Sequence, residues 1–130
     1  SKLLACGLGL MILGLGGVGL DAWLVYAGRG TELVPASLRV GFYLSAALAV
    51  WGFAFVNPSV SSLISKHADP QRQGEVLGVN QSFASLGRIL GPFLGSVLFT
   101  LHPSRTLPFV AAVATLLVVA TLTLRGKRFS

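Results

Sequence analysis

The polar side chains of this chain that could do chemistry lie within long apolar stretches, and Arg88 is the most informative of them. Arg88 is the single charged residue between Val76 and Leu101. A lone arginine at mid-membrane depth costs at least about 2.5 kcal/mol, so it must face protein or a water-filled cavity and find an acceptor. Gln81 can offer one side-chain carbonyl, whereas no carboxylate of the chain is an obvious partner. Arg88 is therefore a candidate for a structural bond between helices or for a contact with a substrate or coupling ion.

A second group of hydrogen-bonding side chains belongs to the apolar run Val40–Ser65, which has no charged residue. On a helix, Tyr43, Asn57 and Ser61 fall on one face together with small apolar residues. Drug-sized ligands favour such mostly apolar walls with a few polar anchors. The Asn57 amide could instead satisfy backbone groups freed by Pro58, because proline lacks the amide hydrogen of a regular helix.

The sequence shows no set of groups suited to chemical catalysis or metal binding. It has no nucleophile–base pair, phosphate-binding loop or cluster of metal ligands, so we expect neither an enzyme nor a cofactor. His67 and His102 are isolated histidines with no second ligand at metal spacing. Asp21 is the one carboxylate inside or bordering an apolar run, which makes it a candidate for proton coupling. Its neighbours Trp23 and Tyr26 place it near a membrane interface, where it can stay hydrated instead.

Four apolar runs must carry these side chains, and each reaches or approaches the length that crosses a bilayer. A spanning helix needs about 20 apolar residues. Hydrophobic residues form 53% of this chain and charged residues 11%, which is a poor fit to a soluble domain. The predicted fold class is therefore all-α, a polytopic membrane protein with four transmembrane helices. The spans are expected at about residues 3–26, 38–66, 70–101 and 106–124.

Residue types at the ends of these runs predict where the helices begin and bend. Ser37 is expected to cap the second helix at its N-terminus. Asp69 as N-cap, followed by Pro70 at the first helical position, is expected to start the third helix. Pro58 is expected to kink the second helix, because it leaves the Ala54 carbonyl without its usual partner.

The net charge of +6 is distributed as in a membrane protein rather than a nucleic-acid-binding one. Four spans place both termini on one side, where the basic residues outnumber those of the other side. The terminal side carries Lys2, Lys66, Arg72, Arg125, Lys127 and Arg128, and the other carries Arg29, Arg39 and Arg105. The positive-inside rule therefore predicts cytoplasmic ends, with the lipid bilayer as a partner and no nucleic acid.

The predicted third helix has a bulky apolar face, which suits lipid, and an opposite face of small residues. Gly87, Gly91 and Gly95 recur every four residues and allow a neighbouring backbone to come close. The order of glycine and proline in this helix resembles the antiporter motif of the major facilitator superfamily. The matching residues are Gly78, Gly87, Gly91, Pro92, Gly95 and Ser96, with serine in place of the final glycine. The segment from Asn57 to Ser82 is similar to the tenth-to-eleventh helix region of tetracycline-efflux-like members.

This resemblance implies that the chain is the carboxy-terminal part, helices nine to twelve, of a twelve-helix drug:proton antiporter in the bacterial inner membrane. It implies alternating-access efflux of a small organic compound, coupled to protons, with the amino-terminal half of the same polypeptide as partner. The second helix would line the central cavity. The implied substrate-binding residues are Tyr43, Asn57, Ser61, Gln81 and Arg88. The implied interdomain packing residues are Gly74, Gly78, Gly87, Gly91, Pro92 and Gly95.

Two other interpretations stay open. A complete four-helix transporter acting as a dimer would resemble the small multidrug resistance proteins, although their essential glutamate in the first helix has no counterpart here. A non-transporting membrane assembly subunit would explain the glycine-rich faces but not Arg88. A much longer natural polypeptide with further spans would support the antiporter interpretation, whereas one of this length would support an oligomer of four-helix units.

Overall fold

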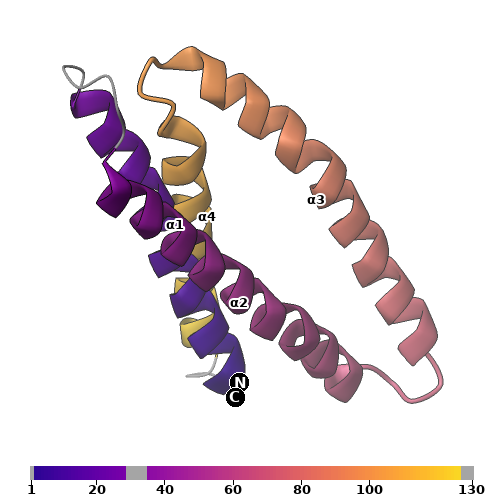
Figure 1. The fold of residues 1–130 in the computed structure, drawn as a ribbon. Coiled ribbons are helices and arrows are strands. Elements are labelled where there is room, and N and C mark those ends of the chain that lie inside the picture. The colour runs from indigo at the N-terminus through magenta and orange to yellow at the C-terminus, as the bar shows by residue number, and fades with distance from the viewer. Residues whose placement is uncertain (1, 29–34, 127–130) are drawn as a thin grey trace.

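The computed structural model describes residues 2–28 and 35–126 as four helices joined by short connections (Figure 1). The helices are α1 (Lys2–Ala27), α2 (Ala36–His67), α3 (Gln73–Leu101) and α4 (Leu107–Gly126). Each is long and apolar enough to cross a bilayer, and the described residues contain no strand. The predicted all-α fold with four transmembrane helices is therefore confirmed.

The core lies along α1, which α2 crosses and α4 flanks (Figure 1). Buried residues on one face of α1 include Leu4, Leu8 and Val18, each at most 6% exposed. Gly14 lies on the same face, and a Cβ at this position would collide with the backbone of Ala49 on α2. The absence of a side chain at Gly14 therefore lets the two helix backbones touch, as small residues do between membrane helices.

Other glycines of α1 and α2 also lie close to a neighbouring helix. Gly52 of α2 is buried, and a Cβ there would lie 2.7 Å from the Gly7 carbonyl oxygen of α1. Gly19 faces α4 instead, where a Cβ would lie 3.0 Å from the Phe109 Cβ. The glycines of α1 thus allow close contact with two different helices, α2 and α4.

Helix α3 diverges from the other helices over most of its length (Figure 1). It has no buried residue and contacts α2 and α4 alone within the described chain. Its bulky face is open, with Phe83 70% and Ile89 71% exposed. A helix with no buried face gains little from packing inside this chain, so lipid or further protein must cover it.

Two helix starts differ from the sequence prediction. Pro35 is the residue before α2, so Ser37 lies inside the helix and does not cap it. The Asp69 Oδ1 atom accepts the Gln71 amide hydrogen at 3.0 Å. Asp69 therefore caps a separate turn, and α3 begins later, at Gln73. Neither helix has a side-chain hydrogen bond at its N-cap, so both capping predictions are wrong.

Helix α2 continues through Pro58 as a single helix, so any bend at this residue does not divide it. The Ser59 hydroxyl donates to the Phe55 carbonyl at 2.7 Å. Such hydroxyl bonds back to the preceding turn are one way in which a membrane helix tolerates an internal proline. The kink itself stays a prediction.

Candidate functional site

The small-residue face of α3 is open in this structure. A Cβ at Gly87, Gly91 or Gly95 would meet nothing within 4 Å. The same is true of Gly74 and Gly78 near the start of the helix. Pro92 also lies in this exposed stretch, inside the helix. The glycines predicted to pack between domains therefore contact no other helix of the described chain.

Arg88 lies in the middle of α3 with an exposed side chain. No hydrogen bond or ion pair joins it to another described residue, and Gln81 does not act as the acceptor considered from the sequence. Arginine at this depth requires a hydrogen-bond acceptor or water. Its partner is therefore water or a group outside the described residues.

The three predicted ligands on α2 are spread along the helix rather than gathered. Tyr43 and Asn57 are about 21 Å apart along the axis, at 1.5 Å per residue. The Ser61 hydroxyl donates to the Asn57 backbone carbonyl at 3.2 Å. The Asn57 amide group is exposed and has no hydrogen bond to the described residues, so it does not satisfy the backbone groups that Pro58 frees.

The five predicted substrate ligands do not share one pocket of the described chain. Tyr43 is 71% exposed and borders a cavity near the start of α2. Asn57, Ser61, Gln81 and Arg88 do not line that cavity. Their role in substrate binding stays a prediction.

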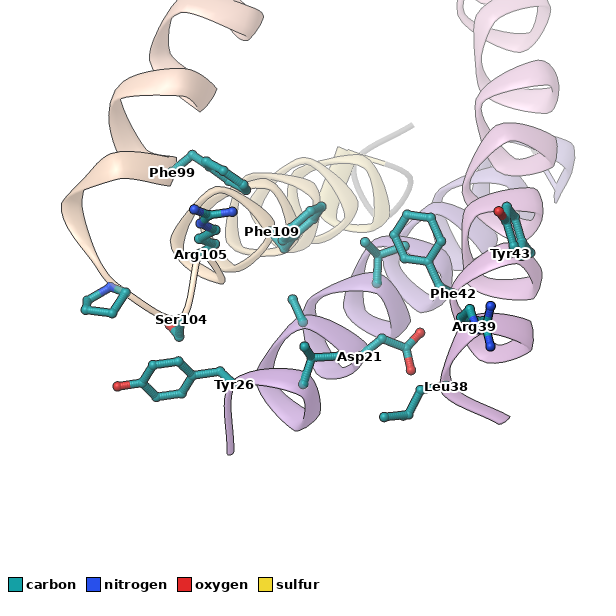
Figure 2. Close-up of a pocket in the computed structure, with 14 residues that line it drawn as sticks. Asp21, Tyr26, Leu38, Arg39, Phe42, Tyr43, Phe99, Ser104, Arg105 and Phe109 are labelled. Carbon is teal, nitrogen blue, oxygen red and sulfur yellow. The ribbon is translucent and has the colours of Figure 1, made fainter. Parts of the chain in front are cut away.

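The cavity has a volume of about 590 Å³ and opens where the end of α1 meets the start of α2 and the α3–α4 connection (Figure 2). Its aromatic walls come from Phe42, Phe99 and Phe109, one from each of three helices. Its lining also includes three charged side chains, which are Asp21, Arg39 and Arg105. The combination of apolar walls and a few charged groups is typical of a small-molecule site.

Asp21 is half-buried in this cavity rather than freely hydrated. Its Oδ2 atom is buried with no hydrogen-bond partner. Gly41 leaves room for the carboxylate, since a Cβ there would lie 3.2 Å from Oδ1. Figure 2 shows the carboxylate directed toward the α2 side of the cavity, where Arg39 lies. The two side chains form no ion pair in the described structure.

Arg105 lies across the cavity from Asp21, on a strained connection (Figure 2). Its φ of 54° is uncommon for a residue other than glycine. The guanidinium carbon lies 5.0 Å from the Phe99 ring centroid, within the range of a cation–π contact. Ser104, which is 4% exposed, fixes the connection through 2.7 Å hydrogen bonds with His102 Nδ1 and Thr106 Oγ1.

Sequence reasoning did not find this cavity, because its charged residues come from three separate segments. A signal was nevertheless present in the sequence. The topology prediction puts Arg39 and Arg105 on one membrane face, and the aromatic neighbours of Asp21 put it at the same interface. Grouping charged residues by predicted membrane depth would have brought the three together.

Comparison with known proteins agrees with the family that the sequence motif resembles. A family model described as Major Facilitator Superfamily matches residues 1–129. Multidrug resistance protein 1 of Bacillus subtilis (strain 168) is 36% identical over 76 residues, which are 58% of this chain and 19% of that protein. Multidrug resistance protein 2 of the same organism is 38% identical over 75 residues, covering 58% of this chain and 18% of that protein.

A mammalian relative shows the same partial coverage. Major facilitator superfamily domain-containing protein 10 of Mus musculus is 33% identical over 76 residues, which are 53% of this chain and 17% of that protein. The chain thus spans less than a fifth of the length of each of these relatives. No solved structure matches it. The family is one of membrane transporters rather than enzymes, and because its model covers nearly all of these residues, the chain belongs to the Major Facilitator Superfamily.

Proposed function

We propose that this chain forms helices nine to twelve of a twelve-helix secondary transporter that exports a small organic compound or drug. In this proposal two six-helix halves rock around a central site to give alternating access, with protons as the coupling ion. Family membership supports transport. Two relatives are named as multidrug resistance proteins, which favours export of organic compounds.

The observation that carries the proposal is the unsatisfied state of α3. Its mid-membrane arginine, Arg88, has no partner among the described residues, and its glycine face meets nothing within 4 Å. An isolated four-helix unit would leave both features exposed to lipid, which is costly for a charged side chain. The amino-terminal half and the remaining helices of a longer polypeptide would supply a close-packed neighbour for the glycines and an acceptor for Arg88.

The substrate site in this proposal lies between the two halves, so this chain contributes one wall of it. Tyr43, Asn57 and Ser61 of α2 would supply polar anchors on an apolar surface. Gln81 and Arg88 of α3 would reach the same site or its edge. Asp21 is a further candidate for proton coupling, since intramembrane acids often mark proton pathways.

The membrane orientation follows from the distribution of basic residues. The first residues of α1 and the last of α4 lie at the same end of the bundle (Figure 1). Basic side chains at that end include Lys2, Lys66 and Arg125. By the positive-inside rule this end faces the cytoplasm of a bacterial inner membrane.

Substitution of Arg88 in the full natural polypeptide tests the proposal. The measurement is accumulation of a fluorescent drug in a bacterial strain without its main efflux pumps. We expect Arg88→Ala to reduce efflux at least about tenfold, as for loss of a hydrogen bond between charged groups. Arg125→Ala, at the membrane end, is the matched control and should leave efflux intact. Normal efflux by a correctly inserted Arg88→Ala variant would contradict a role for Arg88 in transport, whereas a lack of efflux by the unaltered polypeptide would contradict the proposal.

Proton coupling requires a separate measurement. Efflux by the unaltered polypeptide should stop when an ionophore dissipates the proton gradient, and an imposed gradient should drive transport in vesicles of opposite orientation. Efflux that persists without the gradient would remove protons from the mechanism while leaving the transporter proposal in place.

An oligomer of four-helix units is the second candidate, because an unpartnered α3 could equally pack against another copy. The intact mass of the native polypeptide distinguishes the two. If the native chain proved to be of this length, Arg88→Ala should disrupt assembly, as seen by size-exclusion chromatography, rather than transport alone.

A further inference from the structure

The connection between α3 and α4 is short, strained and held by side-chain hydrogen bonds. It consists of residues 102–106. Arg105 has a φ of 54°, and a residue other than glycine keeps such a conformation only where its surroundings hold it there. Ser104 is 4% exposed, so its backbone amide needs an acceptor within the protein. His102 Nδ1 is that acceptor, at 3.1 Å from the Ser104 nitrogen.

The Nδ1 atom of His102 determines the hydrogen-bond pattern of the whole connection. It can accept the Ser104 amide hydrogen only when it carries no hydrogen itself, so this ring is neutral with its hydrogen on Nε2. The same atom lies 2.7 Å from the Ser104 hydroxyl, which lies 2.7 Å from the Thr106 hydroxyl. In this form the Ser104 hydroxyl donates to His102 and accepts from Thr106. The amide and the hydroxyl of Ser104 therefore both depend on an unprotonated Nδ1.

Protonation of His102 reverses one of these hydrogen bonds and breaks another. A hydrogen on Nδ1 donates to the Ser104 hydroxyl oxygen, and this hydroxyl then donates to Thr106. The Ser104 amide loses its acceptor, which costs free energy because the residue is buried. The new positive charge also repels the guanidinium of Arg105, which belongs to the same connection. Each change weakens the contacts that hold the strained backbone.

The titratable and charged groups around His102 in the described chain come from α1, α2 and the connection itself. The Tyr26 ring of α1 lies 6.1 Å from the His102 ring, measured between centroids. Arg105 lines the cavity together with Asp21 of α1 and Arg39 of α2 (Figure 2). His102 is exposed, so a proton from the surrounding water can reach its ring. Its charge can therefore follow the pH at this end of the bundle.

We propose that His102 is a pH-sensitive switch that controls the α3–α4 connection. Neutral His102 holds Ser104 and keeps Arg105 in the cavity, with its guanidinium carbon 5.0 Å from the Phe99 ring centroid. When His102 takes up a proton at mildly acidic pH, the connection opens and Arg105 leaves this position. The cavity then loses one of the two arginines that line it. The switch goes beyond the proposed function, because it depends on neither the substrate nor the coupling ion.

Hydrogen exchange of the full natural polypeptide, followed by mass spectrometry, tests the switch. The Ser104 amide bonds to His102 Nδ1 and the Arg105 amide to the His102 carbonyl, so both report on the connection. Exchange is measured at about pH 5 and about pH 8, the limits between which histidine usually changes charge. After correction for the intrinsic exchange rate at each pH, we expect about tenfold lower protection of residues 102–106 at the acidic pH.

Two results of this measurement would overturn the switch. The first is equal protection of the connection at both pH values. The second is an equal fall of protection in the buried part of α1, because that result would mean a general loosening of the protein. Neither result requires transport to be measured. A polypeptide that shows the switch but no efflux would contradict the proposed function alone.

Three substitutions then assign the pH dependence to His102. In His102→Asn the side-chain oxygen can accept the amide hydrogen two residues on but cannot take up a proton, so protection should stay high at both pH values. His102→Ala has no acceptor, and protection should be low at both. His67→Asn, at the other end of the bundle, is the matched control and should keep the pH dependence. A pH dependence that survives His102→Asn, or high protection in His102→Ala, would overturn the assignment.

Discussion

Helices α1 and α3 both carry glycine at helical spacing, yet the two have opposite surroundings. A Cβ at Gly14 of α1 would collide with the backbone of Ala49, whereas a Cβ at Gly91 of α3 would meet nothing within 4 Å. The first helix holds the buried core of the described chain, and the third has no buried residue. Small residues therefore indicate close helix contact without saying whether the partner belongs to the same four helices.

The two helices also differ in where the contacts that stabilise them come from. Contact between α1 and α2 is made by residues of this chain alone, so it can form as soon as both helices are inserted. Helix α3 has no close neighbour for its glycine face among the described residues, and Arg88 has no partner there. The α1–α2 contact is therefore complete within this chain, and the role of α3 as an interface helix stays a prediction.

The largest expected effect is that of Gly14→Leu. A leucine at Gly14 would force the α1 and α2 backbones apart, and overpacking of this kind costs about 3 kcal/mol or more. We expect a marked fall in the thermal unfolding temperature of the purified full polypeptide, followed by intrinsic fluorescence. Gly16→Leu is the matched control, because a Cβ at Gly16 meets nothing within 4 Å. Equal effects of the two substitutions would break the contrast between contacting and open glycines.

Next in size is Gly91→Leu, which tests whether α3 has a close neighbour elsewhere in the polypeptide. If the small face of α3 packs against further helices, leucine should cost about 1–3 kcal/mol and should lower efflux. Gly16→Leu serves again as control, since both glycines have open space within the described chain. Unaltered stability and transport would mean that this face of α3 borders lipid or a wide cavity.

The fold followed from the sequence because long apolar runs permit few alternatives in a bilayer, where backbone groups must bond within the segment. The glycines of α1 show the limit of that reasoning. Gly7 and Gly14 contact α2, while Gly9 and Gly16, with the same residue type and similar spacing, face open space. The choice between them depends on the crossing geometry of two helices, which no local pattern encodes.

The candidate site was less predictable than the fold, for two physical reasons. The substrate ligands predicted on α2 and α3 would act together with residues outside the described chain, and the four described helices do not bring them into one pocket. The cavity of Asp21, Arg39 and Arg105 requires three chain segments to meet at one membrane end. The position of each residue in the sequence predicts its depth in the membrane, but it does not predict that the three face the same side of the helix bundle.

A smaller effect is expected at the contact between α1 and α4. In Gly19→Ala the new Cβ would lie 3.0 Å from the Phe109 Cβ, so α4 must shift by a few tenths of an ångström. Alanine favours the helix by up to about 1 kcal/mol over glycine, and we expect the collision to outweigh this gain slightly. Gly9→Ala has no such collision and should be neutral or stabilising. The unfolding temperature should therefore fall in Gly19→Ala and stay equal or rise in Gly9→Ala, and a fall in both variants would contradict the predicted collision.

The smallest effect is expected for the ion pair at the start of α3. Arg72 Nε lies 2.9 Å from Glu75 Oε2, but the two side chains are 67% and 59% exposed. Exposed pairs contribute about 0.2–1 kcal/mol, so Glu75→Gln should barely change the unfolding temperature and its effect should fade at high salt. A double-mutant cycle with Arg72→Gln measures the pair directly. A loss well above about 1 kcal/mol would mean that Glu75 also contacts a group outside these helices, and would extend the interface of α3 from its glycines to its first turn.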